Sequence, residues 1–228
     1  MLSALLIAML TAITIWWLLI QRLKDKPWTK QGVVPTSQET LTSSAPKVGL
    51  WVFLAVVSSL FGLFASAYMM RVGGHGGLAV WQPLDEPNLL WINTLVLVLA
   101  SGAMQVARNR TDKDDLAGGR SYFLVAGVLT IVFLVGQMFA WQQARAGGSI
   151  GPGNPAYAFF VLLTAIHGLH LVGGLWVLGR TTTRLFRGID VGDVVARSRA
   201  RMSVQLCTTY WHWLLLIWLG VFALLLST

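Results

Sequence analysis

The chain has 228 residues, of which 55% are hydrophobic and only 11% are charged, and its formal net charge is +8. Soluble domains carry about 25% charged residues, so this composition argues against a soluble domain and favours helices that face lipid. The charge does not indicate a nucleic-acid partner, because no stretch joins base-stacking aromatics to a solvated basic face. The single cysteine, Cys207, excludes an internal disulfide framework and a cysteine-based metal site.

The first predicted element is a membrane span over residues 2–20. It has no basic residue before its apolar run, no small-residue cleavage site after it, and a basic flank, "QRLKDK", at residues 21–26. These features favour a retained N-terminal transmembrane helix (1–26) over a cleaved signal peptide. Residues 27–47 are polar with three prolines, and we interpret them as a cytoplasmic linker.

The rest of the chain, 48–228, is predicted to form a five-helix domain. A helix of about 20 mainly apolar residues spans a bilayer, and every backbone polar group in lipid needs an internal partner. Five stretches meet this length without an Asp or Glu: 48–70, 89–107, 121–142, 157–179 and 204–227. The fold class is therefore all-α, a polytopic membrane helix bundle with six transmembrane helices.

The basic residues predict the orientation of these helices. All lysines and arginines except Arg71 and Arg145 lie in three alternate loops, 21–47, 108–120 and 180–203. Loops rich in Lys and Arg stay in the cytoplasm. We therefore expect these three loops inside the cell and both termini outside.

Polar side chains inside the spans are predicted to join helices, because a polar group in hydrocarbon needs a partner. The candidates are His167, His170, His212 and Gln137. We expect the histidines to hydrogen-bond between the helices at 157–179 and 204–227. Gly174 shares the side of His167 and His170, and a glycine there lets a neighbouring backbone approach closely.

Two sharper interpretations of these spans are less favoured. Two of the three histidines could hold a haem as axial ligands, and the aromatic stripe of Trp211 and Trp218 could form a quinone site rather than a packing or lipid-facing surface. A proton relay is not expected, because no span contains a carboxylate that could store a proton. We predict no catalytic residue and no metal ligand in this chain.

Five segments carry a resemblance to a known family. They are "VGLWVFLAVVSSLFGLFASAYMMR" (48–71), "INTLVLVLAS" (92–101), "GQMFAW" (136–141), "AFFVLLTAIHGLHLVGGLWVL" (158–178) and "YWHWLLLIWLGVF" (210–222). In this order they resemble the five helices that characterise subunit III of the haem-copper (cytochrome c) oxidases, over about residues 48–228.

The resemblance implies a non-catalytic subunit III of a respiratory haem-copper terminal oxidase of the cytochrome c oxidase type. Such a subunit packs on oxidase subunit I, beside subunit II, and binds phospholipids that stabilise the complex during electron transfer to O2. Haem and copper are then expected in the partner subunits, and no cofactor in this chain. Candidate lipid head-group ligands are Arg71, Arg108 and Arg180. A bacterial plasma membrane is favoured over the mitochondrial inner membrane.

The chain departs from the family pattern where the family carries acids. Val57, Ala140 and Leu215 occupy those positions, so proton handling by the family's carboxylates is not expected here. Two alternatives stay open: a subunit III-like accessory protein of a nitric oxide reductase, and a small membrane transporter. The electron donor, the haem types of the partner and the role of the N-terminal helix stay open as well.

Overall fold

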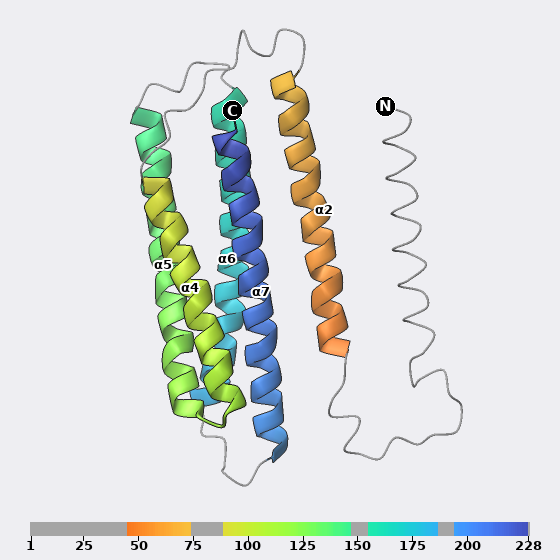
Figure 1. Ribbon diagram of the computed structural model, residues 1–228, viewed down its shortest axis with the longest axis vertical. Helices are drawn as coiled ribbons and strands as arrows, with labels where there is room; N and C mark the ends of the chain where they lie inside the picture. The colour runs from red at the N-terminus through yellow and green to blue at the C-terminus, as the bar shows by residue number, and fades with distance from the viewer. Residues whose placement is uncertain (1–44, 74–88, 147–154, 187–193, 228) are drawn as a thin grey trace, which may run out of the picture. The chain divides into compact units, whose positions relative to one another are not determined.

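The computed structural model describes residues 45–73, 89–146, 155–186 and 194–227. These residues form five α-helices and no strand: α2 (Ala45–Gly73), α4 (Leu89–Asp112), α5 (Leu116–Ala146), α6 (Pro155–Phe186) and α7 (Val194–Leu226) (Figure 1). Each is long and apolar enough to cross a membrane. The five predicted spans from residue 48 onward are thus confirmed as helices. The sixth predicted span, 2–20, and most of the linker lie outside the described residues.

The helices extend beyond the apolar stretches that predicted them. Residues 108–120 were expected to be a loop, but α4 continues to Asp112 and α5 begins at Leu116. The expectation was wrong because apolar length marks only the part of a helix that suits lipid, whereas Arg and Lys also favour helix. Asp114 turns the chain with φ 65°, a left-handed conformation that aspartate tolerates better than most residues.

Asp115 caps the start of α5. Its carboxylate accepts a hydrogen bond from the Gly118 backbone N–H at 2.9 Å and another from Arg110 at 2.9 Å. A side-chain oxygen at this position satisfies a backbone donor that has no partner within the helix. The Gly118 hydrogen bond, and after it the Arg110 guanidinium, lower the pKa of the Asp115 carboxyl below its ordinary value.

Helix α7 packs against α2, α4 and α6, and it reaches α5 through the hydrogen bond of Trp211 to Thr130. Figure 1 shows α4 between α5 and α7. The largest core cluster is shared by α4, α5, α6 and α7, and it centres on the buried side chains of Leu97, Phe133, Leu171, Leu214 and Trp218. Helix α2 joins the bundle along α6 and α7, where Val57 and Phe61 pack against Leu163 and Val221. Much of α2 stays exposed, and its Leu63 is 70% exposed. Exposed apolar surface of this kind suits lipid or another membrane protein.

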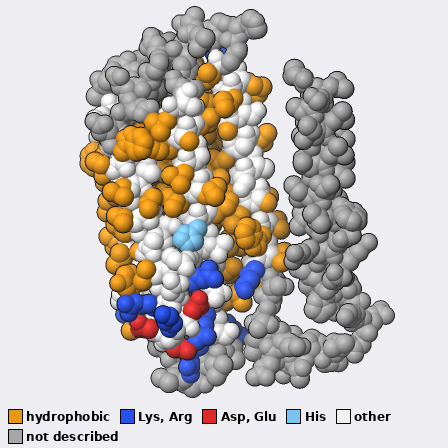
Figure 2. Space-filling view, in the orientation of Figure 1, with side chains coloured by type: hydrophobic (Ala, Val, Ile, Leu, Met, Phe, Trp, Pro, Cys, Tyr) orange, Lys and Arg blue, Asp and Glu red, His pale blue; other side chains and the backbone are white. Residues whose placement is uncertain are grey.

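Charged side chains gather at one end of the bundle (Figure 2). We call this the basic end; it comprises the α4–α5 turn at residues 113–115, the end of α6 and the start of α7. Arg201 of α7 pairs with Asp114 of the turn, with Nη2 and Oδ1 2.5 Å apart. Gln205 also donates to Asp112 at 3.2 Å. These polar contacts tie α7 to the α4–α5 hairpin at the basic end.

Candidate functional site

Four tryptophan side chains hydrogen-bond to hydroxyls on neighbouring helices. Each indole N–H donates to a serine or threonine at 2.9–3.2 Å: Trp141 to Thr164, Trp211 to Thr130, Trp213 to Ser58, and Trp218 to Thr94. The bonds join α5 to α6, and α7 to α5, α2 and α4. These four bonds therefore connect α7 to three of its neighbours, and α5 to α6.

Each accepting hydroxyl takes part in two hydrogen bonds, one as acceptor and one as donor. Each also donates to the carbonyl four residues earlier in its own helix, for example Thr130 to Ala126 at 2.8 Å and Thr94 to Leu90 at 2.8 Å. Measured interhelix hydrogen bonds in membranes contribute about 0.6 kcal/mol on average. Their geometry nevertheless fixes both the depth and the rotation of each helix pair.

The sequence interpretation missed this role of tryptophan. Trp211 and Trp218 were interpreted as a packing or lipid-facing stripe, and both are almost fully buried. A buried indole needs an acceptor for its N–H. The signal available in the sequence was the presence of the hydroxyl side chains of Thr94 and Thr130 inside other spans.

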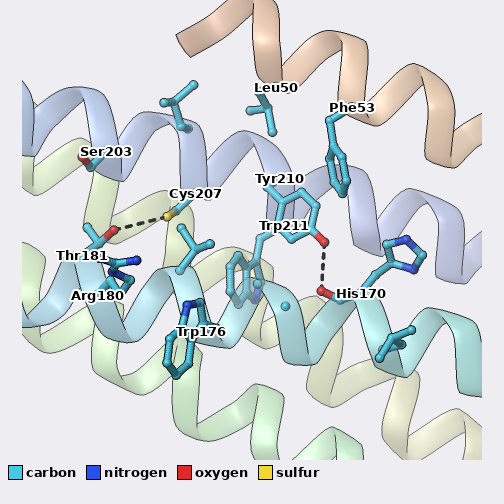
Figure 3. A pocket seen from close by; sticks show the side chains of 15 residues that line it. Leu50, Phe53, His170, Trp176, Arg180, Thr181, Ser203, Cys207, Tyr210 and Trp211 are labelled. Atoms are coloured by element: carbon cyan, nitrogen blue, oxygen red, sulfur yellow. Dashed lines mark hydrogen bonds between the residues drawn. The ribbon is translucent and has the colours of Figure 1, made fainter.

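Gly174 of α6 lies directly against two aromatic side chains of α7. A Cβ at this position would lie 2.8 Å from Tyr210 Cε1 and 3.1 Å from a ring carbon of Trp211. The prediction that a neighbouring backbone approaches here is wrong in the group that approaches, because two aromatic side chains of α7 fill the space. Next to it, the Tyr210 hydroxyl donates to the His170 carbonyl at 2.9 Å (Figure 3).

The intramembrane histidines lie in three different environments. His212 is exposed, and its ring nitrogens pair with Ser101 at 2.5 Å and Gln105 at 2.9 Å, both on α4. His170 Nδ1 lies 2.8 Å from the carbonyl of Ile166 in its own helix. We expected the side chains of these two histidines to hydrogen-bond between α6 and α7. That prediction is wrong, because His212 bonds to α4 and His170 bonds within α6. Helix rotation, which spacing alone does not determine, turns His212 toward α4.

His167 and Gln137 are buried in the core between α5 and α6. The His167 ring contacts Phe133 and Trp218, with centroids 6.0 and 5.1 Å away. Neither the His167 ring nitrogens nor the Gln137 amide atoms have a hydrogen-bond partner among the described residues. The structure therefore places the predicted polar residues at separate positions and not in one cluster with His170 and His212.

The three candidate arginines lie at helix ends. Arg71 is in the last turn of α2, away from the basic end. Arg108, together with Lys47, lines a small cleft of about 170 Å³ between α2, α4 and α7. Arg180 lines a larger one of about 730 Å³, which we call the α6–α7 cleft (Figure 3).

The α6–α7 cleft is apolar along most of its length. Leu50 and Phe53 of α2 form one side, and Trp176, Tyr210 and other residues of α6 and α7 form the rest (Figure 3). Arg180, Thr181 and Ser203 give it a polar end toward the basic end of the bundle (Figure 3). A long apolar groove with one cationic end has the shape and charge of a site for an anionic amphiphile.

The positions where the family carries acids are apolar and packed. Val57 and Ala140 are buried, and Leu215 packs against the largest core cluster. Within the described helices, no group of three or more His, Cys, Asp or Glu side chains is arranged to hold a metal ion.

Relatives of this chain are named as oxidase subunits. A cytochrome c oxidase subunit 3 of Thermostichus vulcanus is 31% identical over 182 residues, which cover 78% of this chain and 85% of that protein. A probable cytochrome c oxidase subunit 3 of Mycobacterium leprae is 29% identical over 185 residues, with 78% and 85% covered. A probable quinol oxidase subunit 3 of Staphylococcus epidermidis is 26% identical over 180 residues, with 77% and 85% covered.

No protein-family model matches the chain. The matched relatives nevertheless extend over most of both sequences, and the shared length agrees with the five helices of the structure. The chain is a multi-pass membrane protein, and it belongs to the haem-copper (cytochrome c) oxidase subunit III family.

Proposed function

We propose that this chain is the non-catalytic third subunit of a respiratory haem-copper oxidase, packed against the catalytic subunit in a bacterial plasma membrane. The names of the relatives include both cytochrome c oxidase and quinol oxidase subunits. Cytochrome c and a quinol are therefore both compatible as the electron donor of the proposed complex. In this proposal subunits I and II hold haem and copper, and the present chain stabilises the complex.

The observation that carries the proposal is a polar row along α4 and α7, which starts at the buried Ser101 and reaches the surface at His212 and Asn109. Ser101 lies near the middle of α4, and His212, its partner, lies near the middle of the α7 span. The row continues through Gln105, whose Nε2 donates to Asn109 at 3.0 Å toward the basic end. His212 and Asn109 are exposed, and Gln105 is half-buried.

A polar row at this depth is poorly suited to lipid. Ionisable and amide side chains within the hydrocarbon region almost always face protein or a water-filled space. Hydrogen bonds within the row already use both nitrogens of His212, which lowers but does not remove the cost of exposure. A transmembrane helix of the catalytic subunit with polar side chains at the same depth would cover this surface.

The basic end supports an orientation for the complex. Lys and Arg favour the cytoplasmic side, so the α4–α5 turn and the start of α7 face the cytoplasm in this proposal. With a sixth span at residues 2–20, both termini lie outside. A protease-sensitive tag at the C-terminus is then expected to be cleaved in intact spheroplasts, and protection of that tag would contradict the orientation.

Phospholipid binding is the second part of the proposed role. In the α6–α7 cleft, acyl chains would lie along Phe53 and Trp176, and the phosphate would pair with Arg180. Arg108 beside Lys47 forms a second cationic position at the basic end, and Arg71 is the corresponding candidate on the opposite side of the membrane. Cationic side chains at helix ends attract anionic head groups.

The test is purification in mild detergent by a tag on this chain. We expect a large haem-containing subunit to co-purify, and purification of the chain without a haem partner would refute the oxidase assignment. The double variant Gln105→Leu/His212→Leu is expected to lose the haem partner while the chain itself stays monodisperse. Val128→Leu, on the exposed side of α5, is the control. Equal haem recovery from both variants would place the interface on another face.

A further inference from the structure

Three polar side chains in the core of the bundle have hydrogen-bonding atoms that no described residue satisfies. Asn93 is 3% exposed, Gln137 is 3% exposed and His167 is fully buried. The unpaired atoms are Asn93 Nδ2, both amide atoms of Gln137 and both ring nitrogens of His167. Buried polar atoms are nearly always paired with protein or with ordered water, so three such side chains in one core need a common explanation.

Contacts between α5 and α6 bring two of the three side chains together. Phe133 touches the His167 ring, and Trp141 donates to Thr164 of the same helix as His167. Gln137 lies one turn from Phe133 and one turn from Trp141, and residues four apart share a helix face. The Gln137 amide therefore faces α6 between the levels of Thr164 and His167.

Helix α4 brings the third side chain to the same region. A Cβ at Gly136 would overlap the Asn93 carboxamide, so that carboxamide lies directly against the backbone of α5. The next residue, Thr94, accepts the indole N–H of Trp218 at 3.0 Å, and the Trp218 ring lies 5.1 Å from the ring of His167. The three unpaired groups thus come from α4, α5 and α6, and they lie in the part of the core that holds Phe133 and Trp218.

We propose that Asn93, Gln137 and His167 form one buried hydrated site, in which ordered water molecules bridge the unpaired atoms of α4, α5 and α6. Water fits this set because the amides and a neutral imidazole offer both donors and acceptors. No carboxylate or cysteine that would hold a cation, and no Lys or Arg that would hold an anion, belongs to the site. A buried water typically makes about three hydrogen bonds.

The site would connect helices that lack a direct side-chain bond at this level. The indole–hydroxyl bonds connect α7 to α4 and to α5, and they connect α5 to α6. By contrast, Asn93 Nδ2 of α4 and both ring nitrogens of His167 of α6 have no partner among the described residues. Water bridging these groups would fix the register of α4 and α6 relative to α5. This inference concerns the chain's own core and does not depend on its role in an oxidase.

The test is radiolytic hydroxyl labelling of the complex purified by a tag on this chain. Hydroxyl radicals form from water and modify side chains beside it, so Phe133 and Trp218 should be labelled although both are fully buried. Phe123 is the matched control, since it is equally buried on α5 but packs among apolar residues such as Met104 and Ala126. Labelling of Phe133 and Trp218 no greater than that of Phe123 would overturn the proposal.

A variant of the site supplies an independent measurement. Gln137→Leu removes two of the bridged atoms, and we expect the labelling of Phe133 to fall toward that of Phe123 and the midpoint of thermal unfolding to decrease. In a dry core, the same substitution removes two unpaired polar atoms and raises the midpoint. An increased midpoint, or unchanged labelling of Phe133 in the folded variant, would contradict the hydrated site.

Discussion

Replacing Gly174 by alanine tests the packing of α6 against α7. The new methyl group would lie 2.8 Å from Tyr210 Cε1 and 3.1–3.2 Å from two ring carbons of Trp211. Neither ring can move freely, because the Tyr210 hydroxyl is bonded to the His170 carbonyl and the Trp211 indole to Thr130. The methyl group must therefore push α7 away from α6 or break these bonds.

The expected loss follows from comparison with the neighbouring glycine. Gly173 has no heavy atom within 4 Å of its Cβ position, so Gly173→Ala introduces a methyl group without a clash. Both substitutions gain about the same helix propensity, up to about 1 kcal/mol, and only Gly174→Ala adds overpacking, which costs about 1–3 kcal/mol. We expect Gly174→Ala to be less stable than Gly173→Ala by about 1–3 kcal/mol.

The measurement is equilibrium unfolding of both variants in mixed detergent micelles with increasing SDS, followed by tryptophan fluorescence. The unaltered chain provides the reference, and far-UV circular dichroism verifies equal helix content before unfolding. Equal unfolding free energies for the two alanine variants would refute the close packing at Gly174.

Three further outcomes are expected. Thr130→Val removes the acceptor of the buried Trp211 N–H and should lower the free energy of unfolding by about 1–3 kcal/mol, whereas Thr130→Ser should stay close to the unaltered chain in the same SDS titration. The pKa of Asp115 is lowered in the folded chain, so the ionised carboxylate stabilises the fold above the ordinary pKa of 3.8, and this stabilisation is lost as the pH falls below that value. Amide exchange at Gly118 should then accelerate relative to its intrinsic rate. Asp115→Asn should remove this pH dependence. Arg180→Gln should reduce the anionic phospholipid that co-purifies, as measured by mass spectrometry of extracted lipids, and an unchanged lipid content would exclude Arg180 as the head-group ligand.

The number and order of the helices from residue 48 onward followed from the sequence alone. Apolar stretches of about 20 residues without acids have one stable solution in lipid, because backbone hydrogen bonds must close within the segment. The same argument underestimated helix length at the basic end, where α4 and α5 extend through Arg108 and Arg120. Hydropathy indicates which residues suit lipid, whereas a helix can continue beyond the bilayer surface wherever its residues favour the helical conformation.

The contact at Gly174 could be predicted only in part. A small residue permits a neighbouring backbone to approach, but the aromatic side chains that fill the space could not be predicted from spacing. The hydrogen-bond partners of the histidines could not be predicted either. Spacing along one helix places residues on a common face, but the rotation of that face toward a particular neighbour depends on how all the helices pack. His212 therefore pairs with Ser101 and Gln105 of α4, and not with α6 as expected.

The sequence by itself determined an acid-free set of apolar helices, a basic end and a resemblance to oxidase subunit III, because these depend on composition and order along the chain. Only the tertiary structure decided which side chains meet. It paired tryptophan indoles with hydroxyls across helices, left polar atoms of Asn93, Gln137 and His167 unpaired in the core, and turned His212 outward. Such pairings depend on the depth and rotation of several helices at once, and those are fixed by packing between residues far apart in the chain.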